Sequence, residues 1–266
     1  MLNWWGFDET AGPTAADYVG NLNDGAYAAS PNDPSPASGL VSNALDLDGN
    51  DYLTVPDDDE IDLSNRPKSG PFKFCSYFAI DAWIKTSHKP GVNVILDKRV
   101  EPSKPVGYSL FLYNGRLGFQ MADGKPAGSA CGPEATHPCS NYVAPGPNVA
   151  DGTWHLIAVT VQVHGSGTAC PEIGKLYVDG NVVHTFVPRT HSLSNGNLPG
   201  SDIANSADLS IGRRAPAFGG GGYFKGLIDE LEFFNARNVN ASSFPGALTQ
   251  AHIQAIHNAG SAGKCP

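Results

Sequence analysis

The chain has 266 residues, of which 41% are hydrophobic, enough for a sizeable core, while only 16% are charged and glycine (31) and proline (21) are frequent. The net charge of −9 and the lack of a basic block argue against a protein that binds nucleic acid or an anionic membrane surface. No apolar run approaches the length of a membrane span, so we expect no membrane insertion. A chain of this length could form two domains, but all-β sandwiches of this size often form one, so we expect a single domain over residues 1–266.

Turn residues and alternating apolar positions predict many short strands in the first third of the chain. Residues 2–10 form an aromatic-rich opening strand, and residues 11–43 read as loop with a short strand at 24–27. Residues 44–56 alternate apolar and polar side chains on both sides of Gly49-Asn50, which predicts a hairpin, and residues 57–62 form an acidic loop. Residues 72–87 are the longest strand candidate.

The pattern continues to the end of the chain. Strands are expected at 92–98, 107–113 and 116–121, and Asn114-Gly115 joins the last two by the strongest hairpin signal in the sequence. After an irregular loop at 122–150, strands follow at 151–163, 174–180, 182–188, 207–213 and 224–234, with Asp179-Gly180 as another hairpin turn. One helix is expected at 248–258, with Thr249 as its N-cap. About a dozen strands and one short C-terminal helix predict an all-β fold, a two-sheet antiparallel β-sandwich or jelly roll.

Five cysteines, Cys75, Cys131, Cys139, Cys170 and Cys265, match no zinc-binding spacing. Cys131 and Cys139 share a loop rich in glycine and proline, and loop cysteines of this kind indicate disulfides in an exported protein. We expect a Cys131–Cys139 disulfide first and a Cys139–Cys170 disulfide second. Residues 1–5 lack the basic start and apolar stretch of a signal peptide, so we expect a mature product or an excised piece of a longer protein.

Several short motifs together resemble a known family. They are Trp5-Gly6-Phe7-Asp8-Glu9-Thr10, Ala44-Leu45-Asp46-Leu47-Asp48-Gly49, Asp51-Tyr52-Leu53-Thr54-Val55-Pro56, Ile80-Asp81-Ala82-Trp83-Ile84, Gly107-Tyr108-Ser109-Leu110, Asp151-Gly152-Thr153-Trp154-His155, Leu176-Tyr177-Val178-Asp179-Gly180 and Gly226-Leu227-Ile228-Asp229-Glu230. In this order and spacing they resemble the laminin-G-like jelly roll of the concanavalin A-like lectin/glucanase superfamily, in its bacterial exported form. The resemblance implies the fold over nearly the whole chain, and it implies no single function because this fold hosts many.

The resemblance also implies a structural calcium ion near the first and last strands, with Asp8 beside Asp229. The segment 17–25 adds carboxylate and amide oxygens from Asp17, Asn21 and Asn23, which suit a hard cation. The competing interpretation is that this segment is a turn rich in Asp and Asn and that Asp229 faces solvent.

Catalysis is the rival hypothesis, because glucanases of similar fold carry three acidic residues on one strand. The nearest match, Asp229-Glu230-Leu231-Glu232, is out of phase, with Glu230 and Glu232 on one face of the strand and Asp229 on the other. We therefore expect a solvated outer face here and no catalytic residues. Pentraxins, which are similar in fold, bind ligand through calcium held by an acidic loop, but the matching residues 213–222 contain no carboxylate.

A ligand site is expected among exposed polar and aromatic residues near strand ends and the tetraglycine segment 219–222, namely Lys98, Arg99, Tyr108, Gln120, Arg213, Arg214 and Tyr223. The leading hypothesis is a non-catalytic module, secreted or at the cell surface, that binds a glycan or another cell-surface polymer. The alternative is a structural or assembly role beside protein neighbours in an extracellular structure, and a glycoside hydrolase or lyase comes third.

Overall fold

The computed structural model describes residues 1–19, 23–63, 75–103, 105–124, 140–164, 173–188, 203–239 and 248–263. Sixteen strands and one α-helix form its framework. The strands are β1 (Asn3–Trp5), β2 (Thr14–Ala15), β3 (Gly25–Tyr27), β4 (Ser35–Ser38), β5 (Asn43–Asp48), β6 (Leu53–Val55), β7 (Cys75–Lys85), β8 (Val92–Val100), β9 (Val106–Tyr113), β10 (Arg116–Asp123), β11 (Ser140–Val143), β12 (Trp154–His164), β13 (Ile173–Val178), β14 (Asn181–Phe186), β15 (Leu209–Ile211) and β16 (Lys225–Val239). The α-helix is α1 (Gln250–Ala259), and two 3-10 turns are η1 (Pro216–Phe218) and η2 (Gly260–Ala262).

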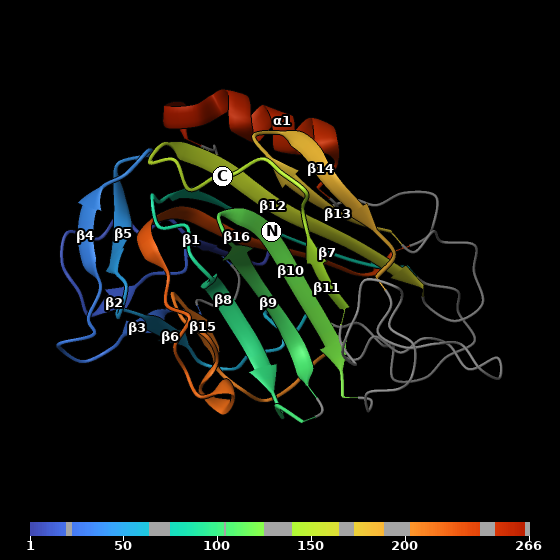
Figure 1. Cartoon of the computed structure of the whole chain (residues 1–266), viewed down its shortest axis with the longest axis horizontal. Coiled ribbons are helices and arrows are strands. Elements are labelled where there is room, and N and C mark those ends of the chain that lie inside the picture. The colour runs from blue at the N-terminus through green and yellow to red at the C-terminus, as the bar shows by residue number, and fades with distance from the viewer. Residues whose placement is uncertain are drawn as a thin grey trace.

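The strands form two antiparallel sheets that face each other, as the sequence predicts (Figure 1). Sheet A has the order β14-β13-β12-β7-β16-β5-β4, with β1 paired to β16, and sheet B has the order β11-β10-β9-β8-β15-β6-β3-β2. One continuous apolar core lies between them, with Trp5, Phe119 and Phe233 among its largest fully buried side chains. The fold is therefore a β-sandwich of the jelly-roll type.

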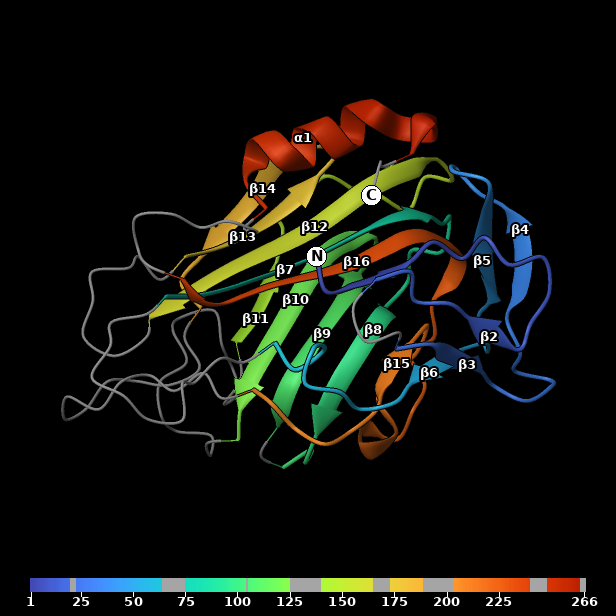
Figure 2. The same cartoon turned by 180° about the vertical axis from the view of Figure 1, so that it is seen from behind.

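The helix α1 covers the outer face of sheet A (Figure 2). Its buried Ile253 and the preceding Leu248 pack with Tyr77, Trp83 and other outward-facing side chains of that sheet into a second, smaller core. Thr249 is the N-cap, and its side chain accepts a hydrogen bond from the His252 amide in a reciprocal capping box, which confirms the prediction. One outer face of the sandwich is thus occupied, and the other outer face belongs to sheet B.

Two of the three predicted hairpin turns are confirmed. Asn114-Gly115 joins β9 to β10 and Asp179-Gly180 joins β13 to β14, with φ values of 50° and 79° in the first turn and 50° and 78° in the second. Two consecutive positive φ angles are typical of a type I′ turn, whose twist matches that of the paired strands.

The hairpin predicted over residues 44–56 is wrong. β5 pairs with β4 and β16 in sheet A, whereas β6 pairs with β3 and β15 in sheet B, so the chain crosses between the sheets at Gly49–Asp51. The Asp51 carboxylate holds this corner by accepting a hydrogen bond from the Asp48 amide at 2.8 Å. The longest strand is also not the predicted one, because β16 has 15 residues and β7 has 11.

Candidate functional site

The strand alternation of sheet B separates core side chains from outward-facing ones. Leu110 and Leu112 of β9 and Leu117 and Phe119 of β10 lie in the core. Because neighbouring residues of a strand point to opposite faces, Ser109, Phe111 and Tyr113 of β9 face outward, and so do their cross-strand partners Gln120, Gly118 and Arg116 of β10. These side chains make up the outer face of sheet B.

A polar row crosses this face from strand to strand. The register places it in the order Asn141, Gln120, Ser109, Asp97, Ser210 and Thr54, on β11, β10, β9, β8, β15 and β6. Polar side chains in one cross-strand line, over a core of apolar ones, are a feature that core packing alone does not require. Gln120, Ser109, Asp97 and Ser210 of this row are buried, so the row itself is not open to a ligand.

An ion-pair network occupies the middle of the polar row. The Arg99 guanidinium donates to Asp97, at 2.7 Å from Nε to Oδ1, and also contacts the Gln120 side-chain oxygen. The Phe218 ring of η1 covers the guanidinium, 4.3 Å from its Cζ. Burial raises the pKa of Asp97, and the hydrogen bonds from Arg99 oppose that rise. The network thus fixes η1 against sheet B, and its buried groups are not open to a ligand.

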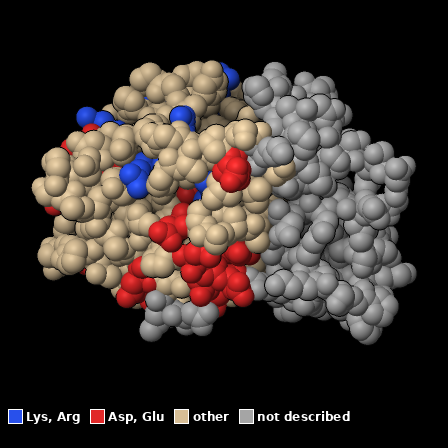
Figure 3. Space-filling model, turned by 90° about the horizontal axis from the view of Figure 1, so that it is seen from below, with Lys and Arg blue, Asp and Glu red and all other residues tan. Residues whose placement is uncertain are grey.

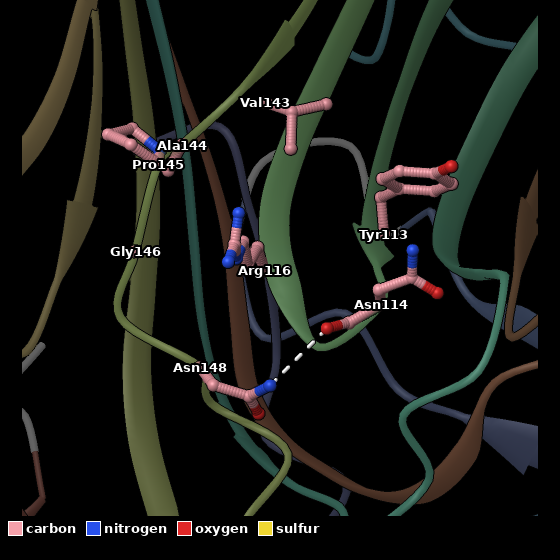
Figure 4. Close-up of a pocket in the computed structure, with 8 residues that line it drawn as sticks. All are labelled: Tyr113, Asn114, Arg116, Val143, Ala144, Pro145, Gly146 and Asn148. Carbon is pink, nitrogen blue, oxygen red and sulfur yellow. Dashed lines mark hydrogen bonds between the residues drawn. The ribbon is translucent and has the colours of Figure 1, made fainter.

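A depression opens further along the same face, at the β9–β10 turn (Figure 4). Its volume is about 580 Å³, and its lining residues are Tyr113, Asn114, Arg116, Val143, Ala144, Pro145, Gly146 and Asn148. The Tyr113 ring is 47% exposed, and the Arg116 guanidinium forms no ion pair with any residue in the described part of the chain. The depression therefore offers one exposed aromatic ring beside an unpaired cation.

The walls of the depression are held by hydrogen bonds from the turn. The Asn148 side-chain amide donates to the Asn114 carbonyl oxygen at 3.3 Å, and its oxygen accepts from the Ala150 amide at 2.9 Å. The Asn114 side-chain oxygen accepts from the Gly91 amide at 2.9 Å. Loop 143–148 and the hairpin turn are thereby fixed relative to each other, so the depression is preformed.

The floor next to the depression is apolar because Gly118 lies beneath the Phe111 ring. A Cβ atom at Gly118 would lie 2.5 Å from that ring, so even alanine would displace it. Val143 is the cross-strand neighbour of Gly118 on the other side. None of the residues that line this depression was among the predicted ligand residues, and the Asn114-Gly115 signal predicted only the hairpin turn beside it.

The structure divides the predicted ligand residues by strand face. Arg99 and Gln120 lie together on the outer face of sheet B but are only 9% and 7% exposed, so the expectation that they are exposed is wrong. Lys98 and Tyr108 point into the sandwich and are 0% exposed, so the expectation that they are exposed is wrong. The Lys98 ammonium contacts Asp57 at 2.6 Å and Asp62 at 2.8 Å, and the Tyr108 hydroxyl donates to the Ile61 carbonyl oxygen at 2.7 Å.

The remaining predicted ligand residues, Arg213, Arg214 and Tyr223, lie in one loop beside β8. The loop is closed by a hydrogen bond of 2.8 Å from the Phe224 amide to the Gly212 carbonyl oxygen. The Arg213 guanidinium lies over the Tyr52 ring at 3.3 Å from its centroid, and Tyr223 forms an isolated bridge with Val94 of β8. This loop borders the outer face of sheet B.

The residues predicted to hold calcium belong to two separate hydrogen-bond networks. The buried Asp17 carboxylate accepts from the Asn3 side chain and from the backbone amides of Trp4, Val19 and Asn23, at 2.8 to 3.2 Å. The Asn23 side chain donates to Glu60. Four protein donors satisfy Asp17, so it does not fit as a cation ligand, and Asn21 lies outside the described residues.

Asp8 and Asp229 lie near each other, as predicted. The turn between β4 and β5 supplies amides to both, since Asn43 donates to Asp8 at 3.1 Å and Leu40 donates to Asp229 at 2.8 Å. Asp229 is 0% exposed, which corrects the alternative in which it faces solvent. Burial, together with the charges of Glu230 and Asp8, raises the pKa of Asp229 to about 7, although hydrogen bonds from the Val41 and Leu40 amides lower it.

The acidic residues of β16 are buried as well. Glu230 is 2% exposed and Glu232 is 0% exposed, so the expected solvated outer face is wrong at this place. The pairing of β16 with β7 is irregular between Asp229 and Glu232, and Glu230 has a φ of 53°, which breaks the simple alternation. Carboxyl groups enclosed in this way do not flank an open groove, as hydrolysis of a glycan chain would require.

The structure does not describe the cysteines of the predicted disulfides. Cys131 and Cys139 lie outside the described residues, and so do Cys170 and Cys265. Within the described ranges, no group of three or more His, Cys, Asp or Glu side chains is arranged to hold a metal ion.

Acidic side chains gather in one patch on the face that is seen from below, and the lysine and arginine side chains in this view lie outside that patch (Figure 3). The loop after β6 supplies five acidic residues, Asp57, Asp58, Asp59, Glu60 and Asp62. Lys98 holds this loop from the inside of the sandwich. The charge of the molecule is therefore unevenly distributed, and the net charge of −9 does not describe every face.

Comparisons with known proteins agree with this architecture. A model described as the concanavalin A-like lectin/glucanases superfamily (Laminin_G_3) matches residues 47–253. No curated protein matches the sequence. No helix in the described ranges is long and apolar enough to cross a membrane.

Three solved structures are similar in fold. The binding domain of Paraclostridial Mosquitocidal Protein 1 has a TM-score of 0.57 and 15% identity, over 97% of this chain and 51% of that chain. Domain 4 of AbnA, a GH43 extracellular arabinanase from Geobacillus stearothermophilus in complex with arabinotriose, has a TM-score of 0.55 and 16% identity, over 96% of both chains. A botulinum neurotoxin type C structure, reported for cell entry that depends on two ganglioside molecules, has a TM-score of 0.53 and 13% identity, over 97% of this chain and 51% of that chain. The chain spans about half the length of the toxin chains it matches.

Proposed function

Because the chain belongs to the concanavalin A-like lectin/glucanases superfamily, we propose that it is a non-catalytic binding module that recognises carbohydrate through the outer face of sheet B. The observation that carries the proposal is the preformed depression of about 580 Å³ with the exposed Tyr113 ring. Small-molecule sites are concave and combine apolar surface with a few fixed polar groups, which is what this depression provides.

The chemistry of the lining suits a sugar. A pyranose or furanose ring has an apolar face of C–H groups and an edge of hydroxyls. The Tyr113 ring offers a flat apolar surface with a polar tip. Arg116, Asn114 and Asn148 line the same depression and carry side-chain donors or acceptors within it. The arabinotriose complex of the arabinanase domain, similar only in fold, agrees with this class of ligand.

The proposal is tested by a glycan array, followed by titration calorimetry on each glycan that binds. Replacing Tyr113 by alanine is expected to weaken binding at least about tenfold, because stacking on an aromatic ring is lost. Tyr18→Ala is the matched control, since Tyr18 is 44% exposed and lies beside Trp4, away from the depression. Equal affinity of the two variants for every glycan would overturn the proposed site.

The absence of catalysis is part of the same proposal. The buried state of Asp229, Glu230 and Glu232 supports it, because these are the acidic residues that a glucanase-like mechanism would use. Incubation of the protein with each bound glycan, followed by chromatography of the products, should show no cleavage. If no glycan binds at all, the structural or assembly role in an extracellular structure becomes the better hypothesis.

Location outside the cell belongs to the proposal too. The similar fold of a domain from an extracellular arabinanase supports it. Fractionation of the native host and detection of the protein in the medium or on the cell surface would test it.

The structural calcium ion stays a prediction. Of the predicted ligands, only Asp8 and Asp229 fit, because Asp17 is satisfied by protein donors. The Asp229 Oδ1 atom is buried and accepts no hydrogen bond from the described residues, and a cation would neutralise it. Thermal unfolding with calcium and with EDTA tests the ion separately from the glycan, and an unchanged midpoint would exclude it.

A further inference from the structure

The tetraglycine segment has a backbone conformation that only glycine adopts readily. Gly219, Gly220, Gly221 and Gly222 have φ values of 80°, 63°, 75° and 57°, so all four are left-handed. Successive backbone N–H groups in a turn conformation can point toward the same side. Backbone N–H groups that converge in this way form a concavity that attracts anions.

The hydrogen bonds of this segment engage its carbonyl groups and leave N–H groups open. The Gly221 carbonyl oxygen accepts from the Arg214 amide at 3.0 Å, and the Gly222 carbonyl oxygen accepts from the Val94 amide at 2.7 Å. The Gly219 amide donates to the Pro216 carbonyl oxygen at 2.9 Å. The amides of Gly220, Gly221 and Gly222 donate to no residue of the described ranges. Three adjacent donors are therefore available.

An unpaired cation lies against these donors. A Cβ atom built on Gly222 would lie 3.4 Å from Nη2 of Arg214, so the guanidinium lies beside the end of the segment. Arg214 forms no ion pair with any described residue. The space beside the segment is open, because Cβ atoms at Gly219, Gly220 and Gly221 would meet nothing within 4 Å. Loop 213–222 also contains two arginines and no carboxylate.

The segment borders the depression that contains Tyr113. The same Cβ position at Gly222 lies 3.5 Å from the carbonyl oxygen of Val92, and Val92 is the cross-strand partner of Tyr113. Two strand spacings separate Tyr113 from the tetraglycine segment, which is about 10 Å. Two linked sugar rings cover a similar length, so one oligosaccharide could reach both places.

We propose that the amides of Gly220, Gly221 and Gly222 and the Arg214 guanidinium bind the anionic group of an acidic polysaccharide, a carboxylate or a sulfate, while a neighbouring sugar ring lies on Tyr113. This inference rests on the proposed function and names the ligand class. Charge-assisted hydrogen bonds from amides and a guanidinium are the interactions that recognise such groups. Loop 213–222 carries two arginine side chains and no carboxylate, so the charge of the loop itself is positive.

The test is a titration of the ¹⁵N-labelled protein followed by NMR, at constant ionic strength. The probes are an oligogalacturonide, its neutral galactose oligomer and sodium sulfate. The oligogalacturonide is expected to shift the amide signals of Gly220, Gly221 and Gly222 downfield, because each N–H gains an acceptor. Arg214→Gln should weaken its affinity by about threefold to tenfold, as expected for the loss of one charged hydrogen bond near the surface.

The matched control is Lys175→Gln, which removes one positive charge from sheet A and should leave the affinity unchanged. Arg214→Lys keeps the charge and should restore part of the binding. Circular dichroism and the thermal midpoint of each variant establish that it is folded. A loss of affinity in Arg214→Gln that equals the loss in Lys175→Gln would overturn the assignment of Arg214.

The outcomes separate this inference from the proposed function. If the neutral oligomer shifts Tyr113 but the oligogalacturonide leaves the glycine amides unmoved, the anion site is wrong and the carbohydrate site stands. If sulfate alone shifts the amides and no oligosaccharide does, the polysaccharide assignment is wrong and the segment binds small anions only. If nothing shifts either place, both proposals are wrong for these ligands.

Discussion

The surroundings of Asp229 disfavour the ionised form of its side chain. Its side chain is 0% exposed, and it shares its surroundings with Asp8 and Glu230. Its pKa in the folded protein is about 7, above the ordinary value of 3.8. The folded state therefore binds a proton in a pH range in which the unfolded state has lost it. Between about pH 4 and pH 7 this group makes the protein less stable as the pH rises, and above pH 7 its effect is constant.

We expect Asp229→Asn to flatten this pH dependence. The asparagine oxygen can still accept from the amides of Leu40 and Val41, while the ionisable group is gone. A rise of about three pH units in the pKa corresponds to about 4 kcal/mol of unfolding free energy, as an upper limit. Urea unfolding from pH 4 to pH 8 measures this loss, since it falls between about pH 4 and pH 7. A variant whose stability falls with pH as steeply as that of the natural protein would contradict the assigned cause.

Lys98 shows why residue roles could not be predicted from the sequence alone. Alternation placed it next to outward-facing Asp97 and Arg99, but a lysine in a strand suggests an exposed side chain and not a core position. Its ammonium is satisfied inside the sandwich by Asp57, Asp62 and the Asn205 carbonyl oxygen, all from other segments. These partners are distant from Lys98 in sequence, so no local sequence pattern predicts them.

Lys98→Met is expected to destabilise the protein by about 2–4 kcal/mol, because Asp57 and Asp62 lose the cation that they share. Denaturant unfolding measures the loss. Lys225→Met is the control, since Lys225 is exposed and should change stability by less than about 0.5 kcal/mol. Equal stability of the two variants would show that the buried ion pair contributes nothing.

At the scale of elements, the strands and the two tight hairpins could be predicted because their signals are local. Asn114-Gly115 and Asp179-Gly180 fix their turns by backbone conformation alone. The arch at Gly49–Asp51 could not be distinguished from a hairpin, because both need a turn between two alternating strands. The choice is made by partners far away, since β5 pairs with β16 and β6 pairs with β15. The Tyr113 depression was missed for a related reason, because loop 143–148 is distant from the hairpin in sequence.

The helix α1 offers an element-scale prediction. Thr249→Ala removes the side-chain oxygen that accepts from the His252 amide at 3.2 Å, which should cost about 1 kcal/mol. Thr249→Ser keeps the hydroxyl and should be nearly neutral. Thermal unfolding followed by circular dichroism compares the two. Equal losses would mean that the capping box does not contribute to stability.

For the whole molecule, the uneven charge predicts how binding responds to salt. The net charge is −9, yet the proposed anion site lies in a loop without carboxylates. An acidic polysaccharide is therefore repelled at long range and held at short range. Affinity for an acidic ligand should change with salt, whereas affinity for a neutral oligosaccharide should not. Calorimetry at 50 mM and 500 mM NaCl would measure both, and an equal salt response would contradict the charged site.

The position of α1 on sheet A has a consequence for how the protein is oriented when it is bound. A sandwich that attaches to a polymer through the outer face of sheet B turns its helix away from that polymer, toward the surrounding medium. An antibody that recognises the exposed side of α1 should therefore still bind the protein on its glycan, and would stain it in place without competing for the ligand. An antibody against the β9–β10 turn should compete.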